Sequence, residues 1–360
     1  MSEHIRADLR PIIRKLVSRI NLSEDEIRRS MSLILGGKAS EAAIASFLVA
    51  LRMKGETPEE IIAILQAVKR YAIKITPNIT GSLVDTCGTG GDTIKSFNIS
   101  TAAAIIACAA GCTVAKHGNR SISGFCGSAD FLEFVGMDLD TSPDTTRKAI
   151  ENIGLGFLYA AKFHPAMRNV ASARESIGIR SAFNIVGPLS NPCTNLSGQI
   201  IGVYDPSLLE TVAVAMQNAQ VDELMVVHSY DGFDELSNTC ENDIIWIVDK
   251  KIKRLRLHPR DVNLSVAKPE QLLIYSREDS IRDTLQVIYG LASHEKEDVA
   301  VLNASAALVI GKIAKDLKEG VEIAREAVKE GIPQKKLLEL IQRCGNKEKL
   351  IKAEQEFLLI

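Results

Sequence analysis

A glycine-rich stretch near residue 90 limits the folds that this chain can adopt. It reads Gly88-Thr89-Gly90-Gly91-Asp92, follows the apolar residues Leu83-Val84, and precedes a helix-like run that starts at Asn98. Glycines lack a Cβ and let backbone N–H groups close around an anion, and a helix N-terminus adds free N–H donors. The stretch has neither the Gly-Lys-Ser/Thr ending of a P-loop nor the G-x-G-x-x-G spacing of a dinucleotide site. It predicts a strand, a phosphate-binding turn and a helix, and a purely structural glycine turn is the alternative.

A second loop of similar composition follows the next predicted strand. Lys116-His117-Gly118-Asn119-Arg120-Ser121 comes after the run Thr113-Val114-Ala115 and continues into Ser123-Gly124-Phe125-Cys126-Gly127-Ser128. Lysine and arginine beside glycine and serine are typical of an anion-binding loop. A single basic loop is usually a solvated turn, but two such loops at the ends of neighbouring strands favour a ligand that carries phosphates at both ends.

The first part of the chain has the apolar spacing of helices, whereas the rest alternates between strands and helices. Residues 5–73 predict four short helices, two of which begin with capping boxes at Ser23 and Thr57. From Leu83 onward, the alternation of strand and helix predicts a mainly parallel sheet. We therefore expect an α/β protein with a small all-helical domain and a larger α/β domain.

The pattern also predicts where the strands lie and where the helices stop. The predicted strands are Leu83–Thr86, Cys112–Ala115, Phe157–Ala160, Gln199–Tyr204 and Glu223–His228, followed by an antiparallel pair at Ile244–Val248 and Ile252–Leu257. Helix breaks are predicted at Gly178, at Gly187-Pro188 and near Gly320.

Charge and cysteine content bear on the class of protein. The 43 basic and 45 acidic residues give a net charge of −2, which lacks the positive field typical of nucleic-acid binding. The seven cysteines are odd in number and have no zinc spacing, so we expect reduced thiols in a cytoplasmic protein. No apolar run reaches the length of a membrane span and the N-terminal residues are charged, so we expect neither a membrane partner nor a secretion signal.

Several further motifs occur together with the two loops. They are Phe97-Asn98-Ile99-Ser100-Thr101, His164-Pro165-Ala166-Met167-Arg168, Arg174, Phe183-Asn184 with Gly187-Pro188-Leu189-Ser190-Asn191-Pro192, and Asp231-Gly232-Phe233-Asp234-Glu235. In these residues the chain resembles the anthranilate phosphoribosyltransferases, which are related in fold to pyrimidine nucleoside phosphorylases. The resemblance covers nearly the whole chain, and several separate motifs in one order are more specific than any single motif.

The resemblance implies a reaction and a metal. The phosphoribosyl group of 5-phosphoribosyl 1-pyrophosphate (PRPP) would pass to anthranilate in tryptophan biosynthesis, with no covalent nucleophile and no essential base, so no residue is assigned a catalytic role. Two magnesium ions would be held by Ser100 and by Asp234 with Glu235. Without the resemblance, Asp234-Glu235 would be interpreted as a solvated acidic turn. A nearby acidic pair, Asp222-Glu223, is less favoured because only the later pair follows a predicted strand, where ligands collect in open α/β sheets.

The resemblance also implies which residues bind each substrate. The PRPP-binding residues expected from it are Gly88, Gly91, Asp92, Ser96, Asn98, Ile99, Ser100, Thr101, Lys116, His117, Gly118, Asn119, Arg120, Ser121, Ile122, Ser123, Gly124 and Ser128. The anthranilate-binding residues expected from it are Gly88, Asn119, His164 and Arg174. The planar guanidinium of Arg174 suits a carboxylate, whereas a lone arginine beside Glu175 would ordinarily be a surface residue. His164 would line the acceptor channel or be a buried histidine bonded to the backbone.

Domain organisation and assembly follow from the same resemblance. In the family, residues 164–190 return to the helical domain, and the active site lies in a cleft between the domains. We expect residues 1–75, with 164–190, to form the helical domain and residues 76–163 and 191–360 to form the α/β domain. A homodimer through the helical domain is expected as well. The open alternatives are a pyrimidine nucleoside phosphorylase-like enzyme and a non-catalytic paralogue that binds nucleic acid.

Three segments depart from the family pattern. Thr93 stands where a glycine is usual in the first loop, Gly124-Phe125-Cys126 replaces a serine-rich segment, and Tyr275–Asp279 replaces a late glycine-rich stretch. The first two touch the PRPP loops, so they bear on the acceptor and the rate more than on the fold. Phe125 would either cover the cleft or pack beneath its loop.

Overall fold

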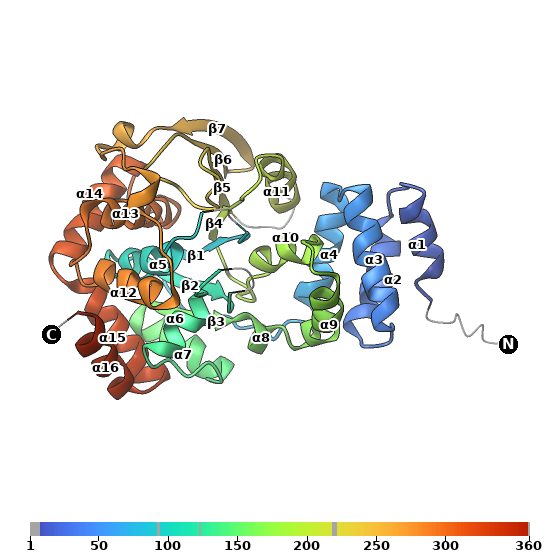
Figure 1. The fold of residues 1–360 in the computed structure, drawn as a ribbon, viewed down its shortest axis with the longest axis horizontal. Coiled ribbons are helices and arrows are strands. Elements are labelled where there is room, and N and C mark those ends of the chain that lie inside the picture. The colour runs from blue at the N-terminus through green and yellow to red at the C-terminus, as the bar shows by residue number, and fades with distance from the viewer. Residues whose placement is uncertain (1–7, 92–93, 122–123, 218–221, 359–360) are drawn as a thin grey trace.

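A helical bundle and a sheet covered by helices make up the molecule (Figure 1). The computed structural model describes residues 8–91, 94–121, 124–217 and 222–358. The four predicted N-terminal helices are α1 (Arg10–Val17), α2 (Glu24–Leu35), α3 (Glu41–Lys54) and α4 (Pro58–Arg70). After β3 (Leu155–Tyr159) the chain returns to them, because α9 (Arg168–Ile177) packs on α2 and α3, and α10 (Ala182–Leu189) packs on α4.

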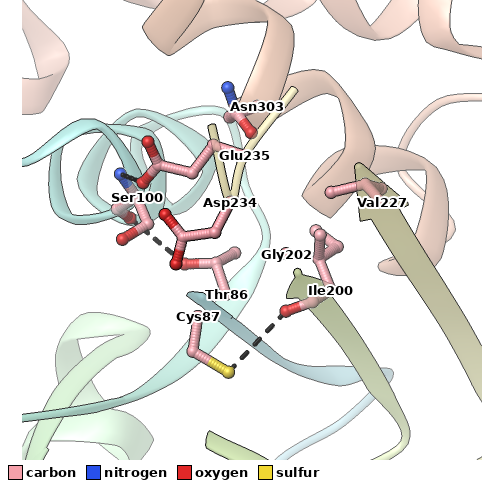
Figure 2. A pocket seen from close by; sticks show the side chains of 9 residues that line it. All are labelled: Thr86, Cys87, Ser100, Ile200, Gly202, Val227, Asp234, Glu235 and Asn303. Carbon is pink, nitrogen blue, oxygen red and sulfur yellow. Dashed lines mark hydrogen bonds between the residues drawn. The ribbon is translucent and has the colours of Figure 1, made fainter. Parts of the chain in front are cut away.

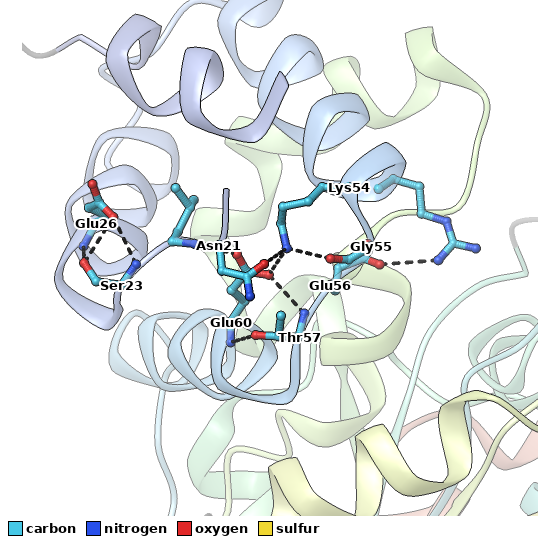
Figure 3. Close-up of polar contacts among 10 residues, drawn as sticks. Asn21, Ser23, Glu26, Lys54, Gly55, Glu56, Thr57 and Glu60 are labelled. Atoms are coloured by element: carbon cyan, nitrogen blue, oxygen red, sulfur yellow. Dashed lines mark hydrogen bonds and ion pairs between the residues drawn. The ribbon is translucent and has the colours of Figure 1, made fainter. Parts of the chain in front are cut away.

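Polar contacts fix the ends of the bundle helices. The predicted capping boxes at Ser23 and Thr57 are both present (Figure 3). Glu60 of the second box is buried, and its Oε2 lies 2.7 Å from the buried ammonium of Lys54. Its Oε1 accepts a hydrogen bond from the N–H of Leu22 at 2.8 Å. One carboxylate therefore joins the end of α3, the start of α4 and the turn before α2, and removing either charge would leave the other buried and unpaired.

The sheet has the strand order β3-β2-β1-β4-β5-β6-β7. Its parallel strands are β1 (Leu83–Gly88), β2 (Thr113–Gly118), β3 (Leu155–Tyr159), β4 (Gly198–Gly202) and β5 (Glu223–Ser229), and β6 (Asn242–Val248) and β7 (Lys251–Leu257) add an antiparallel edge. The predicted mainly parallel sheet and its antiparallel pair are confirmed. Along the chain, β2 and then β3 are added on one side of β1, and β4 is added on the other side of β1. Ligands bind at the carboxyl ends of strands where the order of an open sheet reverses, and here that point lies between β1 and β4.

Helices cover both faces of the sheet, and the side chains of β5 alternate between two cores. Met225 and Val227 pack into one core, whereas Leu224 and Val226 pack into the other, which they share with the bundle. Helices that contribute to the first core are α5 (Ile99–Ala109), α6 (Ser128–Phe134), α7 (Pro143–Ile153), α12 (Arg277–Ile288), α13 (His294–Ile310), α14 (Leu317–Lys329), α15 (Ile332–Cys344) and α16 (Lys347–Phe357). α11 (Leu208–Gln217) packs on β5 and on α4, so it joins the sheet to the bundle, and α8 (Ala160–Phe163) follows β3.

Two predicted helix breaks are wrong, whereas the one at Gly178 is confirmed. Gly178 ends α9 in the left-handed conformation. Gly187-Pro188 lies inside α10, because a proline in the last turn removes only one backbone hydrogen bond and the helix ends one residue later. Gly320 lies in the first turn of α14, and the actual break begins at Gly311. A Cβ on Gly320 would lie 2.9 Å from Cβ of Ser305 on α13, so this glycine permits two helices to approach closely.

The cysteines and the helices show two further features. All seven cysteines are free thiols, and burial raises the pKa of Cys108 and of Cys112 to about 12, which keeps both thiols protonated. Within the described residues, no helix combines the length and the apolar character that crossing a bilayer requires.

Candidate active site

A loop that follows β5 enters a gap between the carboxyl ends of β1 and β4. Gly88 and Gly202 end these strands and face each other in the register. A Cβ on Gly88 would lie 2.1 Å from Oδ2 of Asp234, and a Cβ on Gly202 would lie 1.5 Å from the backbone oxygen of Asp234. The two glycines therefore make room for the loop where the strand order reverses. The pair Asp234-Glu235 reaches the first glycine-rich turn, whereas Asp222-Glu223 lies at the start of β5, at the opposite end of the strand.

Both carboxylates of this loop accept hydrogen bonds from backbone N–H groups of the predicted phosphate-binding elements. Asp234 Oδ2 accepts from the N–H of Gly90 at 2.6 Å, and Glu235 Oε1 accepts from the N–H of Ser100, at the start of α5, at 2.9 Å. Figure 2 shows both carboxylates and Ser100 around one cavity of about 10 Å³, which is room for about one water molecule. Burial raises the pKa of Asp234. Two N–H groups suited to an anion are thus occupied by carboxylates of the chain itself.

Asn303 of α13 holds the acidic loop in place. Its Oδ1 accepts from the N–H of Leu236 at 3.0 Å, and its Nδ2 donates to the backbone oxygens of Leu236 at 2.7 Å and Val299 at 2.8 Å. A buried amide that is satisfied on both sides fixes the residues next to it. Sequence analysis missed Asn303, although an asparagine inside the apolar run of this helix was an available signal.

Lys116 contacts two residues that line the same cavity, Thr86 and Ser100. Its buried ammonium donates to the backbone oxygen of Thr86 at 2.7 Å and to the Ser100 hydroxyl at 3.2 Å. Burial lowers the pKa of Lys116, and the nearby carboxylate of Asp85 opposes this shift. The contacts of Lys116 therefore orient Ser100, and a direct contact with PRPP stays a prediction.

The remaining PRPP candidates near α5 have separate surroundings. Asn98 turns toward α12, where its Nδ2 donates to the Ser280 hydroxyl at 3.1 Å. Ile99 and Thr101 are buried, and the Ser96 hydroxyl donates to the backbone oxygen of its neighbour at 3.3 Å. Gly91 follows Gly90 in the glycine-rich turn, and its φ of +87° is a backbone conformation that favours glycine. Three candidates lie outside the described residues, namely Asp92, Ile122 and Ser123.

The second loop is organised around Asp130 of α6. Asp130 Oδ2 accepts from the N–H groups of Ser121 at 3.0 Å and Gly127 at 2.9 Å, and Oδ1 accepts from Arg120 Nη1 at 2.9 Å. The N–H of Gly124 donates to the Ser121 hydroxyl at 2.7 Å. These donors are satisfied within the loop and by α6, so a phosphate bound here would have to replace some of these contacts.

The base of this loop is tightly packed and its tip is not. The Ser128 hydroxyl donates to the backbone oxygen of Asn119 at 3.2 Å, and a Cβ on Gly118 would lie 2.2 Å from that hydroxyl. The side chain of Phe125 at the tip is 46% exposed. Of the two alternatives for Phe125, packing beneath the loop is less favoured, because nearly half of the residue is exposed.

The two candidate histidines lie together and are neutral at pH 7. The ring centres of His117 and His164 are 5.1 Å apart. Burial lowers the pKa of His164 to about 4, and burial with the neighbouring His164 lowers the pKa of His117 well below its ordinary value. His164 Nε2 lies 3.4 Å from the Ser190 hydroxyl, and the backbone N–H of His117 donates to Oδ1 of Asp85 at 3.0 Å. These rings supply no positive charge to a bound anion.

Arg174 is a partly buried cation without a carboxylate partner among the described residues. Its guanidinium carbon lies 5.9 Å from the centre of the Phe183 ring, and burial lowers its pKa. It does not pair with Glu175, so the surface alternative is not supported. A cation partly removed from water is suited to an anionic ligand. Within the described residues, no hydrogen bond or ion pair connects Arg174 to Gly88 or Asn119, the other acceptor candidates.

Sequence analysis also missed Arg180, which contacts the first glycine-rich turn directly. Its Nη2 donates to the backbone oxygen of Thr89 at 2.8 Å and to that of Gly90. Arg180 lies in the connection between α9 and α10, and no recognisable spacing marked it in the sequence.

The donor set of the cavity fits magnesium. Mg²⁺ prefers oxygen ligands, takes one or two carboxylates from the protein and leaves other positions to water and phosphate. Asp234, Glu235 and the hydroxyl of Ser100 line the same cavity. Across the described residues, no three His, Cys, Asp or Glu side chains gather as a cage of their own. The site therefore suits a cation that arrives with a phosphorylated ligand.

Family models and relatives cover most of this chain. A glycosyl transferase family helical bundle domain matches residues 10–72, and a glycosyl transferase family a/b domain matches residues 80–333. The anthranilate phosphoribosyltransferase of Acetivibrio thermocellus is 41% identical over 334 residues, which are 93% of this chain and 96% of that protein.

Solved structures share the whole architecture. The anthranilate phosphoribosyltransferase of Thermus thermophilus superposes with a TM-score of 0.86 at 35% identity, over 94% of this chain and 99% of that chain. The enzyme of Saccharomyces cerevisiae, solved in complex with PRPP and Mg, has a TM-score of 0.86 at 25% identity, over 95% of this chain and 98% of that chain. The predicted fold class, a small helical domain beside a larger α/β domain, is confirmed.

Proposed function

Because the chain belongs to the anthranilate phosphoribosyltransferase family, we infer that it transfers the phosphoribosyl group of PRPP to anthranilate. The products are N-(5-phosphoribosyl)anthranilate and pyrophosphate, in tryptophan biosynthesis. The observation that carries this conclusion is 41% identity to a phosphoribosyltransferase over 93% of the chain. The test is pyrophosphate release from PRPP and Mg²⁺ that depends on added anthranilate. Phosphorolysis of a pyrimidine nucleoside without PRPP turnover would instead favour the nucleoside phosphorylase alternative.

We propose that the leaving pyrophosphate binds where the glycine-rich turn, the start of α5 and the acidic loop meet. The contacts of Gly90 with Asp234 and of Ser100 with Glu235 support this placement, because both N–H donors now hold a carboxylate. Magnesium, when bound, neutralises charge that develops on the pyrophosphate. A carboxylate that turns toward a cation leaves its N–H donor free for a phosphate oxygen. Binding of the metal should therefore strengthen binding of pyrophosphate, and the reverse. We propose that two magnesium ions bind.

Catalysis of this transfer depends more on the positions of the substrates and on the charge around the leaving group than on a general base. The amine of anthranilate is already neutral at pH 7, so its attack on the ribose requires no strong proton acceptor. The chain has to hold PRPP and the acceptor in line, exclude water and stabilise the leaving group, and these three effects contribute most to the rate of such a reaction. The two histidines are neutral, so neither acts as a cation at the site, and this agrees with a mechanism that depends on positioning.

We propose that Arg174 binds the carboxylate of anthranilate. Arg174→Ala is expected to raise KM for anthranilate by about ten- to hundredfold, because a charged hydrogen bond contributes roughly 1.5–3 kcal/mol. KM for PRPP should change little, and initial rates at varied anthranilate and fixed saturating PRPP provide the measurement. An unchanged KM for anthranilate would remove Arg174 from the acceptor site.

We propose a homodimer through the helical bundle. α1 and α3 are in contact, and the large apolar side chains Val17, Ile20 and Met53 at or just after their ends are 71%, 50% and 75% exposed. Large exposed apolar patches commonly mark interfaces, and these three side chains are the candidates for such a patch. Light scattering at micromolar protein should give twice the chain mass of 39.2 kDa, and Met53→Glu should shift the value toward the monomer. A monomer mass for the unmodified protein would contradict the dimer.

We propose that residues 1–75 with 164–190 act as one domain against residues 76–163 with 191–360, and that substrate binding closes the cleft between them. A cytoplasmic location is supported by the seven free thiols, which persist in reducing compartments.

A further inference from the structure

Arg180 joins the returning helical segment to the glycine-rich turn. It follows Gly178, the left-handed end of α9, and precedes α10. Its Nη2 donates to the backbone oxygens of Thr89 and Gly90. The Gly90 residue is consequently held twice, by Arg180 at its oxygen and by Asp234 at its N–H.

The position of the guanidinium is defined by two further contacts. Its central carbon lies 4.0 Å from the centre of the Tyr204 ring, within the range of a cation–π contact. A Cβ on Gly91 would lie 1.1 Å from Nη1 of Arg180, so the guanidinium occupies the space that a side chain at Gly91 would need. The buried Nε has no hydrogen-bond partner among the described residues, so the group is held by its Nη2 contacts and by the ring.

The same short segment carries the acceptor candidate. Arg174 lies near the end of α9, six residues before Arg180, and the turn between them is closed by Gly178, whose N–H donates to the Arg174 oxygen at 3.3 Å. A connection of six residues thus joins Arg174, the proposed acceptor ligand, to Arg180, which contacts the backbone of the turn that also contacts Asp234. Misplacement of reacting groups by about 1 Å can cost about 10²-fold in rate.

We propose that Arg180 is a positioning residue, which fixes the glycine-rich turn against the segment of Arg174 and so sets the position of PRPP relative to the acceptor. This inference rests on the proposed function for the identity of the substrates. The guanidinium acts through the backbone of Thr89 and Gly90, and its contact with the Tyr204 ring helps to fix its position. A lysine keeps the charge but lacks the planar fork and stacks less well, so it should replace Arg180 only in part.

The test compares Arg180→Ala, Arg180→Lys and Tyr204→Leu with Arg168→Ala, an exposed arginine of the same segment without contact to the turn. Two quantities are measured for each variant: the affinity for PRPP with Mg²⁺ by calorimetry, and kcat with both KM values. Arg180→Ala is expected to weaken PRPP affinity and to lower kcat by about tenfold or more each, since a charged hydrogen bond to the turn is lost. KM for anthranilate should stay within about twofold, the lysine variant should recover part of the loss, and Arg168→Ala should match the unmodified protein.

The double variant Arg180→Ala with Tyr204→Leu adds a second criterion. Its loss should be smaller than the product of the single losses, because both changes remove one arrangement.

If Arg180→Ala raised only KM for anthranilate, or changed neither substrate, the proposal would be overturned. Should the variant simply fold poorly, Arg180→Lys and Tyr204→Leu, each checked for an unchanged melting temperature, would still have to weaken PRPP affinity. Calorimetry with PRPP needs no turnover, so a failure of anthranilate transfer would refute the proposed function without deciding the role of Arg180.

Discussion

Asp234→Asn combined with Glu235→Gln is expected to lower turnover by about 10²- to 10³-fold and to make it depend on higher Mg²⁺. A bound metal contributes several kcal/mol to a reaction of this kind, and about 1.4 kcal/mol corresponds to tenfold in rate. The amides keep the shape of the side chains, and their oxygens still accept from the N–H groups of Gly90 and Ser100. The loss should therefore come from weaker metal binding, and a titration of rate against Mg²⁺ measures it.

The matched control is the same double change at Asp222 and Glu223. These residues lie at the opposite end of β5 from the acidic loop, and Glu223 pairs with Lys312. The control should affect stability more than metal dependence. If the 222/223 variant lost its response to Mg²⁺ while the 234/235 variant kept it, the acidic pair would have been assigned wrongly.

Gly88→Ala should lower kcat by about 10²-fold or more while the protein still folds. The added Cβ would lie 2.1 Å from the Asp234 carboxylate and 2.8 Å from the Asp234 backbone oxygen, so the acidic loop has to shift. A displacement of about 1 Å at the reacting groups is sufficient for a loss of this size. Steady-state kinetics and a thermal melt of the same preparation separate the effect on the site from an effect on stability.

Gly187→Ala provides the comparison. A Cβ at Gly187 would meet nothing within 4 Å, and its φ is not positive, so the variant should keep its rate and its melting temperature. Equal activity of Gly88→Ala and Gly187→Ala would mean that the acidic loop does not have to sit against β1 for turnover.

Sequence reasoning predicted those parts of the site that depend on local patterns. The glycine-rich turn, the start of α5 and the acidic pair after β5 each carry a local signal, namely missing side chains, a helix start or the end of a strand. Their meeting is a consequence of the strand order, in which Gly88 and Gly202 end neighbouring parallel strands. The preference for Asp234-Glu235 over Asp222-Glu223 agrees with this geometry, because only the former lies at the carboxyl end of β5.

Residues that act through distant contacts were not predictable in the same way. Arg180 touches Thr89 across a separation of 91 residues, and nothing in its immediate neighbours marks that contact. Local rules also failed where packing decides, as at Gly320, which permits α13 and α14 to approach closely. For Phe125 the sequence left two positions open, because its exposure depends on the whole loop. The hydrogen bonds inside the second loop through Asp130 likewise required the fold to be known.

The central claim is that this chain joins the phosphoribosyl group of PRPP to anthranilate, and the fluorescence of anthranilate tests it most directly. With PRPP and Mg²⁺ present, we expect a loss of anthranilate fluorescence at a rate proportional to enzyme concentration. The loss should stop when PRPP is omitted or the metal is chelated, and Arg174→Ala should slow it at low anthranilate. Undiminished fluorescence with fresh PRPP, Mg²⁺ and folded protein, while another aromatic amine or a nucleoside is consumed, would contradict this claim.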